Sequence, residues 1–297
     1  MSRALRPRRD ARSTASLFAA ALWLAVATAL AADGGGRWLT RVDEAMKQAA
    51  DGDRYVFVDL YAEWCGWCKV LEEKVFSTPE FQRFTQDWVL LRVDVDDGAE
   101  GSALQARYKA YSLPTTLILD ARGVRIGMLE GFLPAPSFLG RLSGEIDTYD
   151  NLLEAYESAR QSEDPKLLRQ LASELHDRGD GARAATLYRS MLAFLPPGSK
   201  LSAWIYYLLA DAHRLSKRFD DAAQALDRAR QVEAIDDPTL VERLDLLSYQ
   251  IAQDSGDCDA AKANLESFLR KHPLSSHRGE VERTLKALRK GDGTVCA

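Results

Sequence analysis

Two cysteines separated by two residues lie between an apolar segment and an amphipathic one, in the stretch DLYAEWCGWCKVLEEKVF (59–76). Cys65 follows a run that is typical of a β-strand, and Cys68 lies in the first turn of a predicted helix. At the start of a helix, unpaired backbone N–H groups and the helix dipole favour a thiolate, so we expect a low pKa for Cys65. Because only a thiolate attacks a disulfide, we predict that Cys65 is the nucleophile and that Cys68 resolves the mixed disulfide.

Other uses of a cysteine pair stay open. A zinc site normally has four ligands, but no histidine precedes His176 and the remaining cysteines, Cys258 and Cys296, are distant in sequence. Two thiolates alone can hold Cu(I), so a copper-delivery protein is one alternative. The other is a redox-silent scaffold in which the pair is only a structural disulfide. We predict redox chemistry without a metal or a cofactor.

The first half of the chain alternates between β-rich and amphipathic runs. This alternation predicts an α/β sheet with parallel crossovers, and we assign residues 32–148 to this domain. The predicted strands are 55–62, 88–95, 115–120 and 124–131, and the predicted helices are 38–50, 66–74, 79–86, 101–110 and 135–146.

From residue 149 to residue 297 only helical periodicity remains, interrupted by short turns rich in Gly, Pro and Asp. The predicted helices come in pairs that carry large and small residues in a similar order, at a spacing of ~38 residues. This order resembles the tetratricopeptide repeat, whose period is ~34 residues. The second pair has Ala234 where the repeat places a proline. The resemblance implies an all-α repeat domain that could bind a peptide or protein partner, and an irregular helical bundle is the alternative.

Residues 1–31 have the three parts of a secretory signal peptide: a basic start, the uncharged apolar run LFAAALWLAVATAL (17–30), and small residues before a cut after Ala31. A spanning helix needs ~20 apolar residues, and this run is shorter. We therefore expect cleavage and export to the periplasm, and a membrane anchor only if the segment is retained. In such an oxidising compartment, Cys258 and Cys296 are expected either to form a disulfide or to stay as two thiols.

The charge of the chain limits its partners. The formal net charge is −5, and the predicted signal peptide holds five Arg and one Asp, so the rest of the chain is more acidic still. An acidic chain without a basic block argues against nucleic acid or anionic lipid as a partner.

Residues 37–147 resemble the thioredoxin superfamily. VDLYAEWCGWCK is similar to its active-site strand and helix, with Gly-Trp in place of Gly-Pro, and YSLPTTLILD is similar to its cis-proline loop. The motifs DLYA, VFSTPE and Leu-Pro-Thr resemble more closely the C-terminal periplasmic domain of the DsbD family of thiol:disulfide interchange proteins. This resemblance implies a thiol–disulfide oxidoreductase that acts on protein disulfides and needs an external electron donor. It does not extend to the helical half.

The resemblance also implies roles for two carboxylates. Asp59 occupies the position of a buried carboxylate beneath the cysteines, where it would take a proton from Cys68; an ordinary Asp at a strand end is the alternative. Glu63 precedes the motif, and its charge would moderate the acidity of Cys65. Both features favour a reductant over a strong oxidant, and we expect a potential nearer ~−270 mV than ~−120 mV.

A substrate-binding surface is implied as well. Pro114, if cis, would expose the backbone of Leu113 for strand-like pairing with an extended substrate, or it is a plain turn proline. Trp64 and Trp67 would form an apolar collar around the nucleophile, although Trp64 could instead be a core residue. Gly131 would let a substrate backbone approach closely.

Overall fold

The computed structural model describes residues 37–297, apart from 99, 197, 233–236 and 291–297. The predicted signal peptide, Ala234 and Cys296 lie outside the described residues, so the predictions that concern them stay predictions. None of the described helices is long and apolar enough to cross a membrane.

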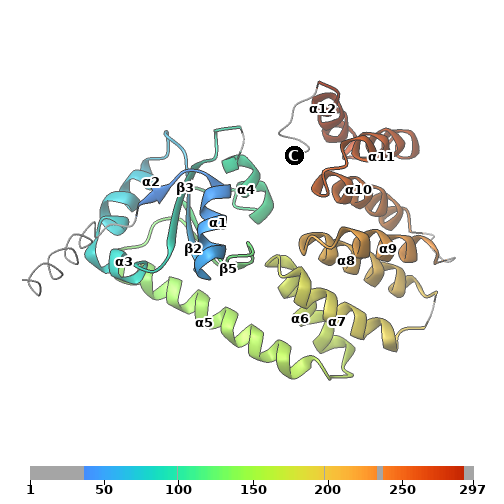
Figure 1. Cartoon of the computed structure of the whole chain (residues 1–297), viewed down its shortest axis with the longest axis horizontal. Helices are drawn as coiled ribbons and strands as arrows, with labels where there is room; N and C mark the ends of the chain where they lie inside the picture. Colours follow the sequence, from blue (N-terminus) through green and yellow to red (C-terminus); the bar gives the residue numbers. More distant parts are fainter. Residues whose placement is uncertain (1–36, 99, 197, 233–236, 291–297) are drawn as a thin grey trace, which may run out of the picture. The chain divides into compact units, whose positions relative to one another are not determined.

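A five-stranded sheet forms the centre of the first half, with strand order β1-β3-β2-β4-β5 (Figure 1). β1 and β2 run parallel to β3, whereas β4 is antiparallel to both β2 and β5. The sheet is therefore mixed: the predicted parallel crossovers occur among β1, β2 and β3. β4 and β5 are antiparallel, because the short turn between them can join only antiparallel strands. The strands are β1 Trp38–Leu39, β2 Val56–Tyr61, β3 Val89–Asp94, β4 Thr115–Leu119 and β5 Arg125–Glu130.

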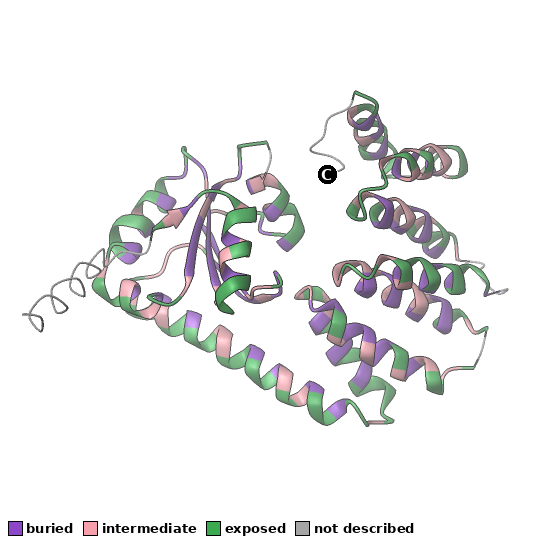
Figure 2. Cartoon of the chain, viewed as in Figure 1, coloured by how far each residue is buried: buried purple, intermediate pink, exposed green. Residues whose placement is uncertain are grey.

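Helices cover both faces of this sheet. α1 and α4 pack on the face that carries Val58, and α2, α3 and α5 pack on the face that carries Phe57. The sheet is consequently buried on both sides, which Figure 2 shows as an almost continuous purple centre. The elements are α1 Val42–Gly52, α2 Gly66–Leu71, a π-helical segment η1 Glu72–Phe76, α3 Pro79–Phe84, α4 Glu100–Tyr108 and α5 Ala135–Ala159.

α5 is longer than predicted. The sequence predicts a helix over 135–146, but the helix continues to Ala159, because Tyr149, Leu152 and Tyr156 extend its buried side and residues 147–159 contain no Pro or Gly. The predicted boundary between residues 148 and 149 falls within this helix, so the chain passes from the sheet-containing half to the helical half without a flexible linker.

The second half is entirely helical in its described part, as predicted, and each helix from α6 onward packs against the next. Asp or Ser side chains cap several helix starts, including Asp164, Asp180 and Ser199, which satisfies backbone N–H groups at the predicted breakpoints. Small residues allow close packing: a Cβ on Gly181 would lie 2.1 Å from the carbonyl oxygen of Ala212. The helices are α6 Pro165–Asp177, α7 Gly181–Phe194, α8 Lys200–Leu215, α9 Phe219–Arg230, α10 Pro238–Asp254, α11 Cys258–Lys271 and α12 Arg278–Arg289.

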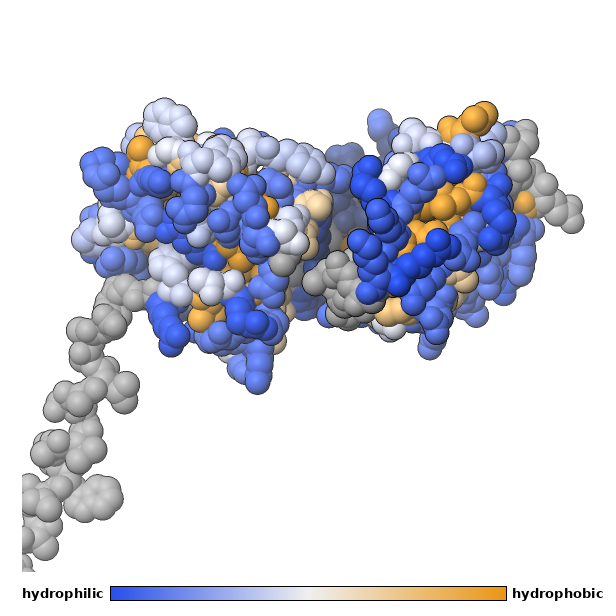
Figure 3. All heavy atoms as spheres, turned by 90° about the horizontal axis from the view of Figure 1, so that it is seen from above, coloured by the Kyte–Doolittle hydropathy of each residue, from blue (hydrophilic) through white to orange (hydrophobic). Residues whose placement is uncertain are grey.

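The turn between α6 and α7 binds the edge strand β5. The backbone N–H of Arg125 donates to the carbonyl oxygen of Arg178 at 2.8 Å, and Arg178 Nη1 donates to the carbonyl oxygen of Ile126 at 2.7 Å. These bonds use polar backbone groups that an edge strand otherwise leaves unpaired. These hydrogen bonds agree with the grouping of residues 36–297 into one compact unit. In the view of Figure 3 its surface is mainly hydrophilic, with some hydrophobic patches.

Candidate active site

Cys65 and Cys68 form a disulfide with an S–S distance of 2.05 Å at the start of α2. Cys65 is the N-cap residue of this helix, and its Sγ accepts a hydrogen bond from the backbone N–H of Cys68 at 3.1 Å. In the disulfide form both residues are buried, with 4% of Cys65 and 1% of Cys68 accessible. The helix start near Cys65 Sγ is the environment that stabilises a thiolate once the disulfide is reduced.

A buried carboxyl lies in the strand that leads to the cysteines. Asp59 on β2 is only 1% exposed and pairs in register with Arg92 on the neighbouring strand β3. Arg92 Nε lies 3.2 Å from Asp59 Oδ2, close enough for an ion pair but without the geometry of a hydrogen bond. Arg92 Nη1 lies 2.7 Å from Glu72 Oε1. The backbone N–H of Glu72 donates to the carbonyl oxygen of Cys68, so this charged cluster reaches the helix that carries the cysteines.

Burial raises the pKa of Asp59 to about 7; the charge of Arg92 opposes this rise, and the charge of Glu72 adds to it. The hydrogen bond and charge of Arg92 lower the pKa of Glu72 against its partial burial. The two carboxyls thus differ in protonation state near neutral pH: Glu72 is ionised, and Asp59 is close to half-protonated. A carboxyl that titrates near neutral pH can accept and return a proton, which is the role the sequence predicts for Asp59.

Arg92 and Glu72 are absent from the residues that the sequence analysis selects. Arg92 occurs within the apolar run WVLLRVDV (88–95), and a lone cation in such a strand needs a partner when it is buried. That signal could have identified Arg92. The pairing with Asp59 could not have been predicted without the register of β2 and β3, which joins residues far apart in sequence.

Aromatic side chains beside the cysteines are exposed. Trp64 and Trp67 are 72% and 61% accessible, which excludes a core role for Trp64. Trp67 stacks on Phe132 with ring centroids 5.7 Å apart, and Trp64 Nε1 donates to Asp96 Oδ2 at 2.7 Å. Exposed aromatic rings held by such contacts offer a rigid apolar surface for a partner. Phe132 is a member of this surface that the sequence analysis missed.

The loop before β4 completes the candidate site. The Leu113–Pro114 peptide bond is cis, as the resemblance implies. The register of β2 and β4 pairs Thr115 with Leu60, so this peptide lies next to the end of the strand that leads to Cys65. In the described structure, neither the N–H nor the C=O of Leu113 has a hydrogen-bond partner, which leaves both groups available for an extended peptide.

Gly131 holds the other side of this loop. Its N–H donates to the carbonyl oxygen of Pro114 at 2.8 Å, and its φ of +80° is one that L side chains rarely adopt. No atom lies within 4 Å of the position that a Cβ would take. The positive φ favours glycine at this position, and the open space beside it is where a substrate backbone could approach.

Two predicted residues remain: Glu63, directly before Trp64, and Cys258. Glu63 is exposed, and Cys258 begins α11 in the helical half. Cys258 is not a free thiol, but Cys296 lies outside the described residues, so a disulfide between the two stays a prediction. Over the residues that the structure describes, no group of three or more His, Cys, Asp or Glu side chains is arranged to hold a metal ion.

Comparisons with known proteins agree with this arrangement over the first half of the chain. A family profile described as thioredoxin-like matches residues 37–121. The thiol:disulfide interchange protein DsbD of Cronobacter sakazakii is 40% identical over 108 residues, which are 35% of this chain and 18% of that protein. DsbD of Ralstonia nicotianae is 36% identical over 112 residues, which are 37% of this chain and 18% of that protein. The chain therefore aligns with less than a fifth of the length of these relatives.

Solved structures resemble the same half. A thioredoxin from Thermus thermophilus is 30% identical with a TM-score of 0.33, and the match covers 37% of this chain and 86% of that one. The C-terminal domain of Neisseria meningitidis DsbD in the oxidised form is 25% identical with a TM-score of 0.31, over 36% of this chain and 98% of that one. The family profile and the order of the elements show that the described chain consists of an N-terminal thioredoxin-like α/β domain with a mixed sheet, followed by an all-helical region.

Proposed function

We propose that this protein is a thiol–disulfide oxidoreductase that reduces disulfides in other proteins. The observation that carries the proposal is the Cys65–Cys68 disulfide at the start of α2, in the same site as the cis Leu113–Pro114 peptide. A buried carboxyl with a pKa of about 7 in the adjoining strand supplies the proton transfer that such a reaction needs. The resemblance to the DsbD relatives over this half of the chain supports the same class of activity.

The reaction starts from the reduced pair. The Cys65 thiolate attacks one sulfur of a substrate disulfide, which forms a mixed disulfide and releases the other substrate sulfur as a thiolate that takes up a proton. Asp59 then accepts the proton of Cys68, and the Cys68 thiolate attacks Cys65 Sγ. The second substrate thiol leaves, and the Cys65–Cys68 disulfide remains. Two electrons have passed from the cysteine pair to the substrate, with one proton from Cys68 by way of Asp59 and one from solvent, so an external donor must reduce the pair before the next cycle.

The substrate surface is the exposed aromatic pair together with the loop at Pro114. An extended substrate chain pairs with the free backbone groups of Leu113, and its apolar side chains contact Trp64 and Trp67. Backbone pairing depends little on side-chain identity, so this surface suits a range of unfolded or loop segments that contain a disulfide.

Three further parts of the proposal concern direction, location and the helical half. We propose that electrons flow from this protein to its substrates, that residues 1–31 direct export to the periplasm, and that residues 149–297 are a tetratricopeptide-like domain for a protein partner. Pairwise packing of the helices and the close approach of Gly181 to Ala212 support a repeat architecture.

Reduction of insulin by dithiothreitol, followed as turbidity, tests the proposed activity. The wild-type protein should accelerate the reaction, and Cys65→Ser should abolish the acceleration. Cys258→Ser is the matched control, because it removes a sulfur outside the site, and it should retain the activity. Equal activity of wild type and Cys65→Ser would leave the cysteine pair as a structural disulfide and would refute the proposal.

A further inference from the structure

A second surface with a distinct chemistry lies away from the cysteine pair. A cavity of about 510 Å³ is lined by residues from the end of α4 and from α6, α8 and α10, and by neither Cys65 nor Pro114. We name it the cationic groove, because it contains more basic than acidic side chains. The basic residues are Arg107, Lys109, Arg169, Arg178, Arg214 and Arg243, and the acidic ones are Asp177 and Asp211. This excess is notable in a chain whose net charge is −5.

Four of these cations have no acidic partner in the described part of the chain. Arg107, Lys109, Arg169 and Arg243 are exposed, and no described carboxylate lies within ion-pair distance of any of them. Arg107 and Arg243 instead lie over the rings of Tyr108 and Trp204, at 5.3 and 5.6 Å from the ring centroids. Such stacking orients a guanidinium but leaves its donors available to an anion.

One of the two acidic residues of the groove, Asp211, already has basic partners in the floor of the cavity. Asp211 accepts hydrogen bonds from Arg214 Nε at 2.7 Å and contacts His176 Nε2 at 2.8 Å. Burial opposes ionisation of Asp211, but the hydrogen bond from His176 and the charge of Arg214 lower its pKa to about 2. The hydroxyl of Tyr188 lies 3.3 Å from His176 Nδ1, so the floor is a connected polar network. Among the described residues, the exposed groove side chains without an ion pair are then the four cations and Asp177, so a cationic excess remains.

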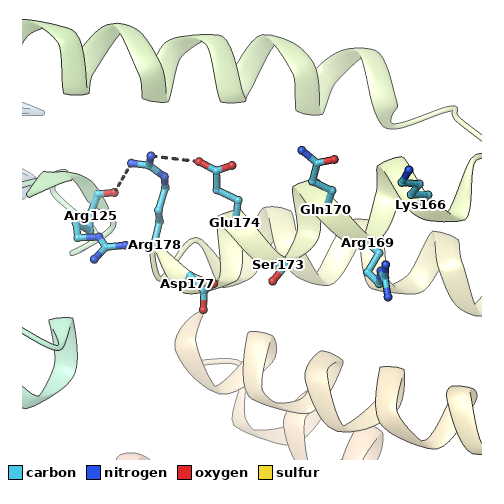
Figure 4. A pocket seen from close by; sticks show the side chains of 8 residues that line it. All are labelled: Arg125, Lys166, Arg169, Gln170, Ser173, Glu174, Asp177 and Arg178. Carbon is cyan, nitrogen blue, oxygen red and sulfur yellow. Dashed lines mark hydrogen bonds and ion pairs between the residues drawn. The ribbon is translucent and has the colours of Figure 1, made fainter.

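A neighbouring cavity shares its lining at α6 with the cationic groove: Arg169, Ser173, Asp177 and Arg178 border both. Figure 4 shows Arg169, Ser173 and Asp177 on one side of the helix, whereas Glu174 and Arg178 point away from them. Glu174 and Arg178 form an ion pair at 3.2 Å. Arg169 is the unpaired cation that α6 contributes to the groove.

We propose that the cationic groove binds an extended acidic segment of a partner protein. The unpaired cations lie on separate elements, α4, α6 and α10, so they match charges spread along a chain better than a single small anion, which needs donors that converge on one point. Tyr207 and Leu208, both partly exposed, line the same groove and offer contact area for apolar residues between the acidic ones. This proposal goes beyond the redox reaction, and neither depends on the other.

Fluorescence anisotropy with a labelled peptide tests the proposal. The probe is an alternating Glu-Leu peptide of about ten residues, ~33 Å long when extended, and its control has Gln in place of each Glu. The oxidised full-length protein should bind the Glu peptide and not the Gln peptide. Binding should weaken as the NaCl concentration rises, because the contacts are exposed charge pairs.

Variants with matched charge changes locate the binding site. The triple substitution Lys109→Gln, Arg169→Gln, Arg243→Gln should weaken binding by about ten-fold or more. The control substitution Lys47→Gln, Arg270→Gln, Arg283→Gln removes the same charge from exposed positions outside the groove and should leave binding unchanged. Both variants should keep the wild-type melting temperature and the wild-type insulin reduction.

Several outcomes would overturn the proposal: no binding of the Glu peptide, equal binding of the Gln peptide, or equal loss of binding in both triple variants. Tighter binding of a labelled single-stranded oligonucleotide than of the Glu peptide would assign the groove to a different class of partner. If the triple variant is unstable, Arg169→Glu alone serves, and it should lose the Glu peptide and gain affinity for a Lys-Leu peptide of the same length.

Discussion

Asp59 is the residue whose protonation connects stability with activity. Its pKa rises from an ordinary 3.8 to about 7 in the folded protein. Between pH ~4 and pH ~7 the folded state therefore keeps a proton that the unfolded state has lost, so stability should fall as pH rises through this window and level off above it. The expected loss by pH 8 is on the order of 2–4 kcal/mol.

Asp59→Asn should remove this dependence. The variant should be more stable than the wild type at pH 8 by on the order of 2–4 kcal/mol and nearly equal to it at pH 4, because the amide carries no charge to bury. Urea unfolding of the two oxidised proteins across this pH range measures the difference. The same variant should reduce insulin about 10- to 100-fold more slowly, because Cys68 loses its proton acceptor. A variant that is less stable than the wild type at pH 8 would contradict a raised pKa of the buried Asp59 carboxyl.

Arg92 and Glu72 should shift the titration of Asp59 in opposite directions. Arg92 lowers the pKa of Asp59 and Glu72 raises it. Arg92→Met should therefore raise the pKa of Asp59, and Glu72→Gln should lower it. Carbon-13 NMR of the Asp59 carboxyl reports the pKa directly, and the pH profile of insulin reduction should move in the same direction. A shift of the same sign in both variants would show that packing changes, and not the two charges, control the titration.

At the scale of single elements, substitution of glycine by alanine should change the free energy of unfolding in opposite directions at two positions with different backbone conformations. Gly131→Ala should destabilise the protein by about 1–2 kcal/mol, because alanine disfavours a φ of +80°. Gly140→Ala is the matched control: Gly140 lies within α5, exposed and with open space around its Cβ position, so alanine should stabilise the helix by up to about 1 kcal/mol. Urea unfolding measures both. Equal effects of the two substitutions would contradict the backbone argument.

Most elements could be predicted because their pattern is local. The strands β2 to β5 agree with the predicted runs to within one or two residues, since each is a short apolar run bounded by turn residues. β1 was missed because Trp38–Leu39 is too short to have a period of its own and precedes a helix. The extension of α5 was missed because its buried side continues where the predicted domains were expected to meet.

The candidate site was only partly predictable for a different reason. Cys65, Cys68 and Pro114 belong to short contiguous motifs, so sequence alone could select them. Arg92 and Phe132 reach the site through strand register and ring stacking, which are long-range contacts. The cationic groove is a further case, because its cations come from helices that are far apart in sequence.

At the scale of the whole molecule, two functional surfaces share one compact unit. The turn that contains Arg178 binds β5, and α5 continues from the sheet into the helical half without a break. A partner that binds the cationic groove would therefore contact a part of the chain that is connected to the sheet without a flexible linker. The proposed function requires in addition that the reduced Cys65–Cys68 pair donates electrons to its substrates.

A redox titration of the Cys65–Cys68 pair against glutathione is the most direct test of that central claim. Electrophoresis after thiol alkylation reports the reduced fraction, and the double substitution Cys258→Ser, Cys296→Ser confines the signal to the pair in the site. Covalent trapping of substrates by Cys68→Ala, expressed in the compartment that we propose, the periplasm, complements the titration. We predict a potential nearer ~−270 mV than ~−120 mV, the value of a strong oxidant, together with mixed disulfides on Cys65. A potential above about −150 mV would contradict the account and make the protein an oxidant of its partners.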